Sequence, residues 1–173
     1  MDITKLLELG GAVILPLIIL SVIALTLIVE LIIVNVKSHG NLKSLNNNEA
    51  ILPSYDPVSK AFSAKGDTDD KVNTLTFEIQ KVERRTSVLS AIASISPLVG
   101  LLGTVFGMIK IFNVVSVERP ANPLEALSGG ISEALFATAG GLLVAIISGF
   151  AHHFLTNSLE SINDKSLLYL DKN

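Results

Sequence analysis

Three long apolar stretches constrain the fold of this chain more than any other feature. They cover residues 11–36, 88–115 and 127–155. A helix that crosses the hydrocarbon core of a bilayer needs about 20 consecutive apolar residues, and each stretch exceeds that length. Only 17% of the 173 residues are charged, compared with about a quarter in soluble domains. The sequence therefore predicts an all-α integral membrane protein with three transmembrane helices.

The first stretch has an alternative interpretation as a signal peptide. A signal peptide begins with a basic segment, has an apolar core of roughly 7–15 residues and ends at a small-residue cleavage site. The apolar run over residues 11–36 is longer than such a core, and it lacks both the basic segment and the cleavage site. We therefore expect this stretch to be retained as a membrane span.

Composition also excludes several functions. The chain has no cysteine, so it has no disulfide, thiolate metal site or cysteine nucleophile. Its net charge of −3 argues against a nucleic-acid partner. An intramembrane enzyme would need a Ser–His pair, paired aspartates or an HExxH zinc motif. The three stretches contain no aspartate and no such spacing, so we expect neither an enzyme nor a cofactor.

The basic residues predict the orientation. Only Lys5 and Arg119 lie clearly on one side of the predicted membrane. Residues 37–87, on the other side, contain Lys37, Lys43, Lys60, Lys65, Lys71, Lys81, Arg84 and Arg85. The positive-inside rule therefore places residues 37–87 and the 156–173 tail in the cytoplasm. The N-terminus and residues 116–126 are then on the outer side of the membrane.

Shorter segments complete the predicted architecture. Residues 1–10 have a helix-like apolar pattern that suits a short interfacial helix on the outer side. Residues 38–57 are rich in Asn, Ser and Pro and are predicted to form a loop, and residues 119–123 a tight turn.

Spans two and three are both expected to continue into the cytoplasm. Apolar residues recur at helical spacing before span two, and no proline interrupts them until Pro97. Asp67, Thr68 or Asp69 is the expected N-cap of this helix. A similar apolar stripe in the tail comprises Leu155, Leu159, Ile162, Leu167 and Leu170.

Small residues gather on one side of the second and third spans. They comprise Ser96, Gly100, Gly103, Thr104 and Gly107, and then Gly130, Ala134, Ala137, Thr138, Gly141, Ala145, Ser148 and Gly149, with His152 on the same side. Such residues let membrane helices approach closely, so simple packing explains most of them. Packing does not explain Glu133, because an ionisable group within a span by default faces a bundle interior or a wet cavity. An interfacial carboxylate that reaches water is the alternative.

Long sequence blocks resemble the ExbB/TolQ/MotA proton-channel superfamily. The first is "GGAVILPLIILSVIALTLIVE", with its Gly-Gly, Pro16 and an acid, Glu30, at the inner end. The second is "VERRTSVLSAIASISPLVGLLGTVFGMIKIF", which resembles the second span of that family. The third is "ISEALFATAGGLLVAI", which resembles the third span. Together the blocks extend over essentially the whole chain.

The resemblance implies a ring of identical subunits, typically a pentamer, whose second and third spans line a pore. A single-span partner of the ExbD/TolR/MotB type sits inside that pore and supplies an aspartate that binds and releases H⁺. Thr104 and Thr138 match the pore threonines, and Glu133 matches the acid at the outer end of the third span. The pore-face packing positions are then Gly100, Gly103, Gly107, Ala137, Gly141 and Ala145. For each threonine, a hydrogen bond to its own helix backbone is the alternative.

Other charged residues are candidate sites at the two ends of the spans. Arg84 and Arg85 are expected to bind lipid phosphates or acids of a neighbouring subunit. Leu31 follows Glu30 where family members often have Arg, which leaves a charge pair at Glu30 doubtful. Lys110 is unusually placed, so it either snorkels outward or repels cations from the pore mouth. His152 either passes protons inward or, with His153, marks the interface.

The short chain most resembles the small ExbB-type proteins, which transmit the proton motive force to a TonB-like protein for outer-membrane nutrient uptake. A TolQ-like subunit that energises envelope maintenance is the alternative. A non-conducting membrane scaffold would share the small-residue packing but would not need Glu133, Thr104 and Thr138.

Overall fold

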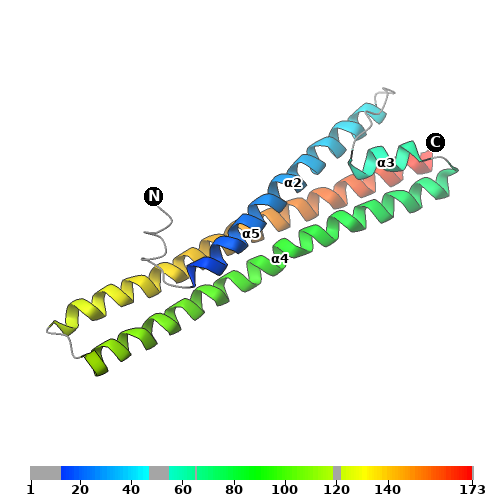
Figure 1. The fold of residues 1–173 in the computed structure, drawn as a ribbon. Coiled ribbons are helices and arrows are strands. Elements are labelled where there is room, and N and C mark those ends of the chain that lie inside the picture. Colours follow the sequence, from blue (N-terminus) through cyan, green and yellow to red (C-terminus); the bar gives the residue numbers. More distant parts are fainter. Residues whose placement is uncertain (1–12, 47–54, 65, 119–121, 173) are drawn as a thin grey trace. The chain divides into compact units, whose positions relative to one another are not determined.

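The computed structural model describes residues 13–46, 55–64, 66–118 and 122–172. Within these ranges every regular element is helical (Figure 1). The elements are α2 (Ile14–Asn46), α3 (Pro57–Ser63), α4 (Thr68–Asn113), the π-helix η1 (Val114–Glu118) and α5 (Pro123–Lys172). Helices α2, α4 and α5 are each long and apolar enough to cross a membrane. The predicted all-α chain with three candidate spans is therefore confirmed.

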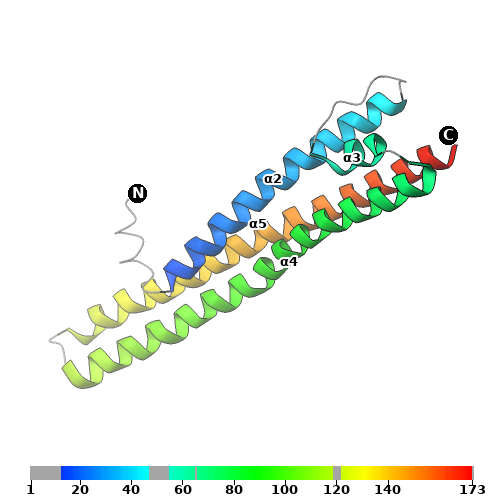
Figure 2. The same cartoon turned by 45° about the vertical axis from the view of Figure 1, so that its right-hand side comes forward.

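The contacts divide the chain into two compact units, described here separately. The first unit comprises Met1–Leu25 and Ala91–Gly149, and the second comprises Thr26–Ser90 and Phe150–Asn173. In the first unit, α4 and α5 lie side by side, and in the second unit α2, α3, α4 and α5 pack together (Figures 1 and 2).

The first unit has an apolar surface and a thin interior of small residues. Large side chains such as Leu98, Leu135 and Ile146 are 62–68% exposed, whereas Ala134 and Ala137 are buried. A soluble domain rarely exposes so many contiguous large apolar side chains. This distribution suits a surface that faces lipid and leaves close helix contact to the small residues.

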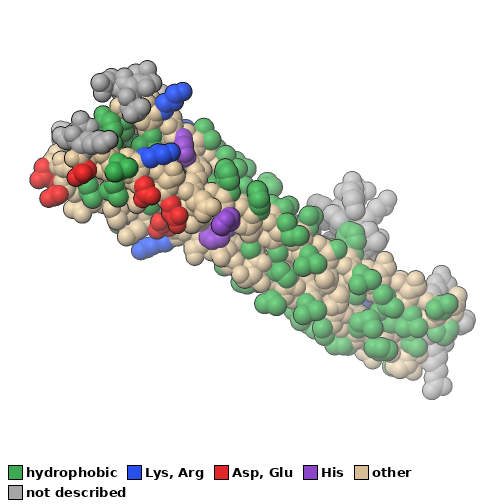
Figure 3. Space-filling model, turned by 180° about the vertical axis from the view of Figure 1, so that it is seen from behind, with side chains coloured by type: hydrophobic (Ala, Val, Ile, Leu, Met, Phe, Trp, Pro, Cys, Tyr) green, Lys and Arg blue, Asp and Glu red, His purple; other side chains and the backbone are tan. Residues whose placement is uncertain are grey.

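The second unit has a conventional hydrophobic core around α3. One cluster joins Ala61, Leu75, Ile79 and Leu170, and another joins Leu45, Val58 and Ile162. The rings of Phe62 and Tyr169 meet edge to face, with their centroids 5.7 Å apart. Charged side chains lie among apolar ones on the surface of this unit in the view of Figure 3.

Two predictions about helix continuity are confirmed. Helix α4 runs without a break from Thr68 through Pro97 to Asn113, and the Asp67 carboxylate caps it by accepting from the Asp70 backbone N–H at 3.1 Å. Helix α5 continues to Lys172. In the tail stripe Leu155, Leu159 and Ile162 are almost wholly buried, at 0–2% exposure.

The predicted loop over residues 38–57 is wrong for its first nine residues, because α2 continues to Asn46. Two of the polar residues that indicated a loop are buried, since Ser38 and Asn41 are 0–5% exposed. Asn41 donates to the Asp56 carboxylate at 2.9 Å, and Leu45 packs against Val58. Tertiary contacts thus override local propensity here. The predicted interfacial helix over residues 1–10 and most of the 119–123 turn lie outside the described residues.

Candidate functional site

Helices α4 and α5 of the first unit are in backbone contact because their facing positions carry small residues. A Cβ on Gly103 would lie 2.7 Å from the Ala137 Cβ, and a Cβ on Gly141 would lie 2.5 Å from the Ser96 carbonyl oxygen. Neither distance is possible without moving a helix. We call this contact the glycine seam; it comprises Gly100, Gly103, Gly107, Ala134, Ala137 and Gly141. Ala145, predicted on the same face, is half-buried.

The two threonines predicted to line a pore differ in what they contact. The Thr138 hydroxyl donates across the seam to the Gly100 carbonyl oxygen at 3.0 Å. The Thr104 hydroxyl donates to the Leu101 carbonyl of its own helix at 2.7 Å. Thr104 therefore makes the backbone bond that was the alternative to a pore role, while Thr138 joins two helices. In both cases the hydroxyl oxygen can still accept a hydrogen bond from water or another group.

Glu133 and Lys110 form an ion pair across the same two helices. The Lys110 Nζ lies 3.3 Å from Glu133 Oε2 and 3.4 Å from Oε1. The Glu133 side chain is 19% exposed and that of Lys110 is 67% exposed. This pairing was not predicted from the sequence, where the roles expected of the two residues were independent of each other. Lys110 lies one helical turn after Gly107, and Glu133 lies next to Ala134, the seam residue that Gly107 faces. These positions in the sequence could have indicated the ion pair.

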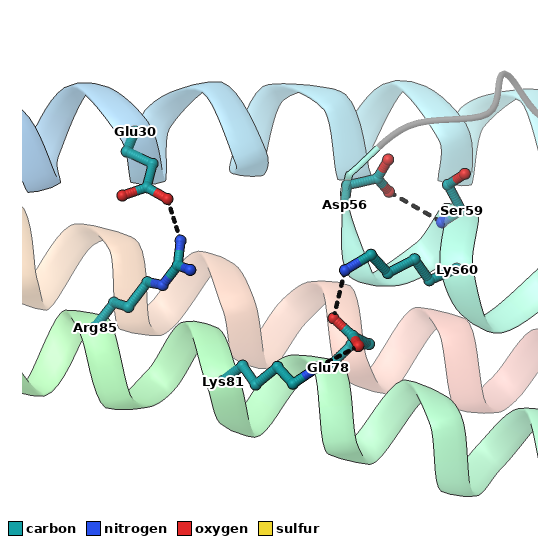
Figure 4. A network of polar contacts seen from close by, with 7 residues as sticks. All are labelled: Glu30, Asp56, Ser59, Lys60, Glu78, Lys81 and Arg85. Carbon is teal, nitrogen blue, oxygen red and sulfur yellow. Dashed lines mark hydrogen bonds and ion pairs between the residues drawn. The ribbon is translucent and has the colours of Figure 1, made fainter.

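In the second unit, Glu30 of α2 pairs with Arg85 of α4 (Figure 4). The doubt about a charge pair at Glu30 was therefore misplaced, because the cation comes from another helix rather than from the next residue. Arg85 was expected to bind lipid phosphate or a neighbouring subunit, and it has an acid partner within its own chain. Arg84 is exposed.

His152 connects α5 to α4 in the same unit. Its Nδ1 lies 2.9 Å from the Thr86 carbonyl oxygen. A carbonyl oxygen only accepts, so Nδ1 carries the proton in this contact and Nε2 remains an acceptor in the neutral ring. Nearby, the Ser158 hydroxyl donates to the Asn35 side-chain oxygen at 2.8 Å, which joins α5 to α2.

A second charged cluster, which was not predicted from the sequence, fixes α3 on α4 (Figure 4). The Glu78 carboxylate accepts from Lys60 at 2.8 Å and from Lys81 at 2.7 Å. Glu78 precedes the apolar stretch of α4. Burial alone would raise its pKa, but the hydrogen bonds and charges of Lys60 and Lys81 outweigh burial and hold the pKa of Glu78 below its usual value. At the start of α3, the buried Asp56 carboxylate accepts from the Ser59 backbone N–H at 3.0 Å.

The first unit thus contains polar groups that can bind or exchange a small cation. A carboxylate, an ammonium and two hydroxyls lie along two closely packed apolar helices. Within the described ranges, no group of three or more His, Cys, Asp or Glu side chains is arranged to hold a metal ion.

Comparison with known proteins gives a family match and several similar relatives. The pattern of the MotA/TolQ/ExbB proton channel family matches residues 61–166, which is more than half of the chain. The chain is 37% identical over 95 residues to the Tol-Pal system protein TolQ of Haemophilus influenzae, covering 55% of this chain and 41% of that protein. It is 36% identical over 80 residues to the biopolymer transport protein ExbB of Aquifex aeolicus, covering 46% of this chain and 53% of that protein.

A second ExbB, from Xanthomonas campestris pv. campestris, is 34% identical over 88 residues, with 51% of this chain and 34% of that protein covered. The matches thus span between about a third and a half of the length of these curated relatives. The family pattern contains most of α4 and α5, including the glycine seam, Thr104, Lys110, Glu133 and Thr138. The chain therefore belongs to the MotA/TolQ/ExbB proton channel family.

Proposed function

We propose that this chain is an ExbB-like subunit of a proton-driven motor in a bacterial inner membrane. Copies of the chain assemble into a ring of five subunits around a single-span partner of the ExbD/TolR type. Proton flow through the ring drives mechanical work on a TonB-like protein that serves outer-membrane nutrient uptake. Residues 37–87 and 156–173 face the cytoplasm, while the N-terminus and residues 116–126 face the periplasm.

The family match over residues 61–166 carries this proposal. It contains the two helices that the family resemblance assigns to the pore wall. The polar groups on these helices support it further, because Glu133 and the two threonines lie on largely apolar spans, where an ionisable group by default has a functional role. Thr104, Glu133 and Thr138 are the residues we assign to the proton pathway.

A TolQ-like role in envelope maintenance is the second candidate. The relatives include both proteins named ExbB and a protein named for the Tol-Pal system, at 34–37% identity. The subunit contributes the same helices in the ExbB-like and the TolQ-like role, so the two roles differ in the proteins that bind it.

Purification of the full chain from native membranes in mild detergent tests the proposal. We expect it to elute as an oligomer together with a small single-span protein that has an aspartate in its membrane helix. A co-purifying TonB-like protein identifies the ExbB role, and TolA- or Pal-like proteins identify the TolQ role. Recovery of the chain alone, as a stable ring in several detergents, contradicts the partner-dependent motor and favours a scaffold.

Substitutions separate conduction from assembly. Glu133→Ala and Thr138→Val are expected to leave a stable oligomer that has lost most of its proton-dependent activity. The control is Ser116→Ala, at an exposed position beyond α4, which is expected to retain activity. Full activity in both pathway variants would contradict the assigned proton pathway.

A further inference from the structure

Lys110 and Glu133 are the only charged residues in the first unit whose side chains the structure describes. The other side chains described in that unit are apolar, small or uncharged. An isolated charge in such surroundings is strongly unfavourable, so each of these two groups stabilises the other. The pair as a whole carries no net charge.

The ammonium contacts both oxygens of the carboxylate. The two N···O distances, 3.3 and 3.4 Å, are nearly equal, so Lys110 bridges the carboxylate rather than binding one oxygen. Glu133 is mostly covered by the chain, whereas the Lys110 side chain is two-thirds exposed. Both residues are fixed to helices that the glycine seam holds in backbone contact. The ammonium is therefore tethered beside the carboxylate.

We propose that Lys110 is a specificity-determining residue, a tethered cation that excludes Na⁺ from Glu133 and leaves this carboxylate open to protons only. This inference rests on the proposed function as an ion-conducting subunit. It assigns to Lys110 a role different from snorkelling or general repulsion of cations.

The difference between the two ions lies in how each one binds. A hard metal cation is held by several oxygen ligands, among which a carboxylate supplies the negative charge. At Glu133, Na⁺ must compete for both oxygens with an ammonium whose effective concentration is high because it is tethered.

A proton avoids this competition. It forms a covalent O–H bond to one carboxylate oxygen, while the ammonium keeps its contact with the other oxygen. On release that O–H bond breaks, the proton passes to water or to the next acceptor, and the original pair is restored. On arrival the proton leaves a hydronium ion, whose O–H bond breaks as the carboxyl O–H bond forms, and on release a new bond forms between the proton and the accepting oxygen.

The test uses the full chain with the proteins that co-purify with it, reconstituted in liposomes under an imposed membrane potential. Uptake of H⁺ is followed with a pH-sensitive dye, and uptake of Na⁺ with radioactive sodium. The unmodified chain and Lys110→Arg, which keeps the cation, are expected to take up H⁺ but no Na⁺ above the level of protein-free liposomes. In Lys110→Met and Lys110→Gln the ratio of Na⁺ to H⁺ uptake should rise by about tenfold or more. A tenfold change corresponds to about 1.4 kcal/mol in the relative free energies of binding Na⁺ and H⁺.

Two outcomes overturn the inference: Na⁺ uptake by the unmodified chain at a rate comparable to H⁺, or proton-conducting Lys110→Met and Lys110→Gln variants that still exclude Na⁺. If the unmodified chain conducts neither ion, the proposed conduction itself is contradicted. Thermal unfolding of the purified chain in detergent then decides the inference, with NaCl compared against choline chloride. An ion that binds the folded state raises its stability. The inference is supported if Na⁺ stabilises Lys110→Met or Lys110→Gln but stabilises neither the unmodified chain nor the double variant Lys110→Met/Glu133→Gln. Absence of that stabilisation overturns it.

Discussion

The hydroxyl of Thr138 joins two helices, whereas the hydroxyl of Thr104 stays within its own helix. Both residues match the same family feature, and the sequence gives no reason to distinguish them. The distinction comes from the glycine seam, which brings the Gly100 carbonyl within 3.0 Å of the Thr138 hydroxyl. At the residue scale, the structure therefore predicts unequal effects for two similar substitutions.

Thr138→Val is expected to destabilise the chain by about 0.5–1.5 kcal/mol, the range of single hydrogen bonds between membrane helices. Thr104→Val removes only a bond to its own helix and is expected to change stability by less than about 0.5 kcal/mol. The free energy of unfolding of the two variants, titrated in mixtures of a mild and a denaturing detergent, measures the difference. Equal effects would show that the bond across the seam does not contribute to stability.

At the scale of elements, close contact between α4 and α5 depends on the absence of side chains at the seam. A Cβ at Gly141 would meet the Ser96 carbonyl oxygen, which belongs to the backbone and cannot rotate away. Gly129 lies on the same helix α5, with nothing within 4 Å of an added Cβ. The two glycines therefore form a matched pair.

Gly141→Ala is expected to push α4 and α5 apart and to destabilise the chain by about 1–3 kcal/mol, as overpacking does in a tight interior. Gly129→Ala is expected to be neutral or to stabilise the helix by up to about 1 kcal/mol, because alanine favours helix more than glycine. Thermal unfolding in detergent measures both. A tolerated Gly141→Ala would mean that the two helices are not in backbone contact at this point.

The attachment of α3 to α4 is expected to depend on pH. The pKa of Glu78 is lowered in the folded chain from its ordinary value of 4.5. Stability from a group with a lowered folded-state pKa is fully present above the unfolded value and is lost as the pH falls through the folded value. Amide hydrogen exchange in residues 57–63 should therefore accelerate at pH values below 4.5, beyond the intrinsic effect of pH on exchange.

Glu78→Gln is the control for that measurement. It keeps the size of the side chain but removes the charge, so α3 should already be more weakly attached to α4 at neutral pH. Acidification should then cause no further increase in exchange through protonation at position 78. An acid response of the same size in Glu78→Gln would assign the effect to another group.

At the scale of the whole molecule, the proposed orientation can be tested because the natural chain has no cysteine. Single substitutions Ser116→Cys and Ser63→Cys introduce one exposed thiol in each of two segments. A membrane-impermeant thiol reagent added to cells with a permeabilised outer membrane should label Ser116→Cys directly. It should label Ser63→Cys only after the inner membrane is disrupted. The reverse pattern would overturn the orientation that the positive-inside rule predicts.

Much of the architecture could be predicted from the sequence, because apolar length and periodicity are local properties. The three candidate spans, the start of α4 ahead of Pro97 and the extension of α5 all follow from runs of residues at helical spacing, and α4 continues through Pro97. The loop predicted from residue 38 failed because composition does not reveal whether Ser38 and Asn41 are buried. The choice of polar residues for a candidate site was also local, since Glu133 and the threonines stand out on apolar spans.

Pairings between helices could not be read in the same way. The bond of Thr138 to Gly100 joins residues 38 positions apart, and the Arg85–Glu30 pair joins residues 55 apart. The sequence by itself determined that this chain is helical, apolar and sparsely charged, because those properties depend on near neighbours along the chain. Only the tertiary structure decided which charge neutralises which, because a counter-ion is chosen by distance in space.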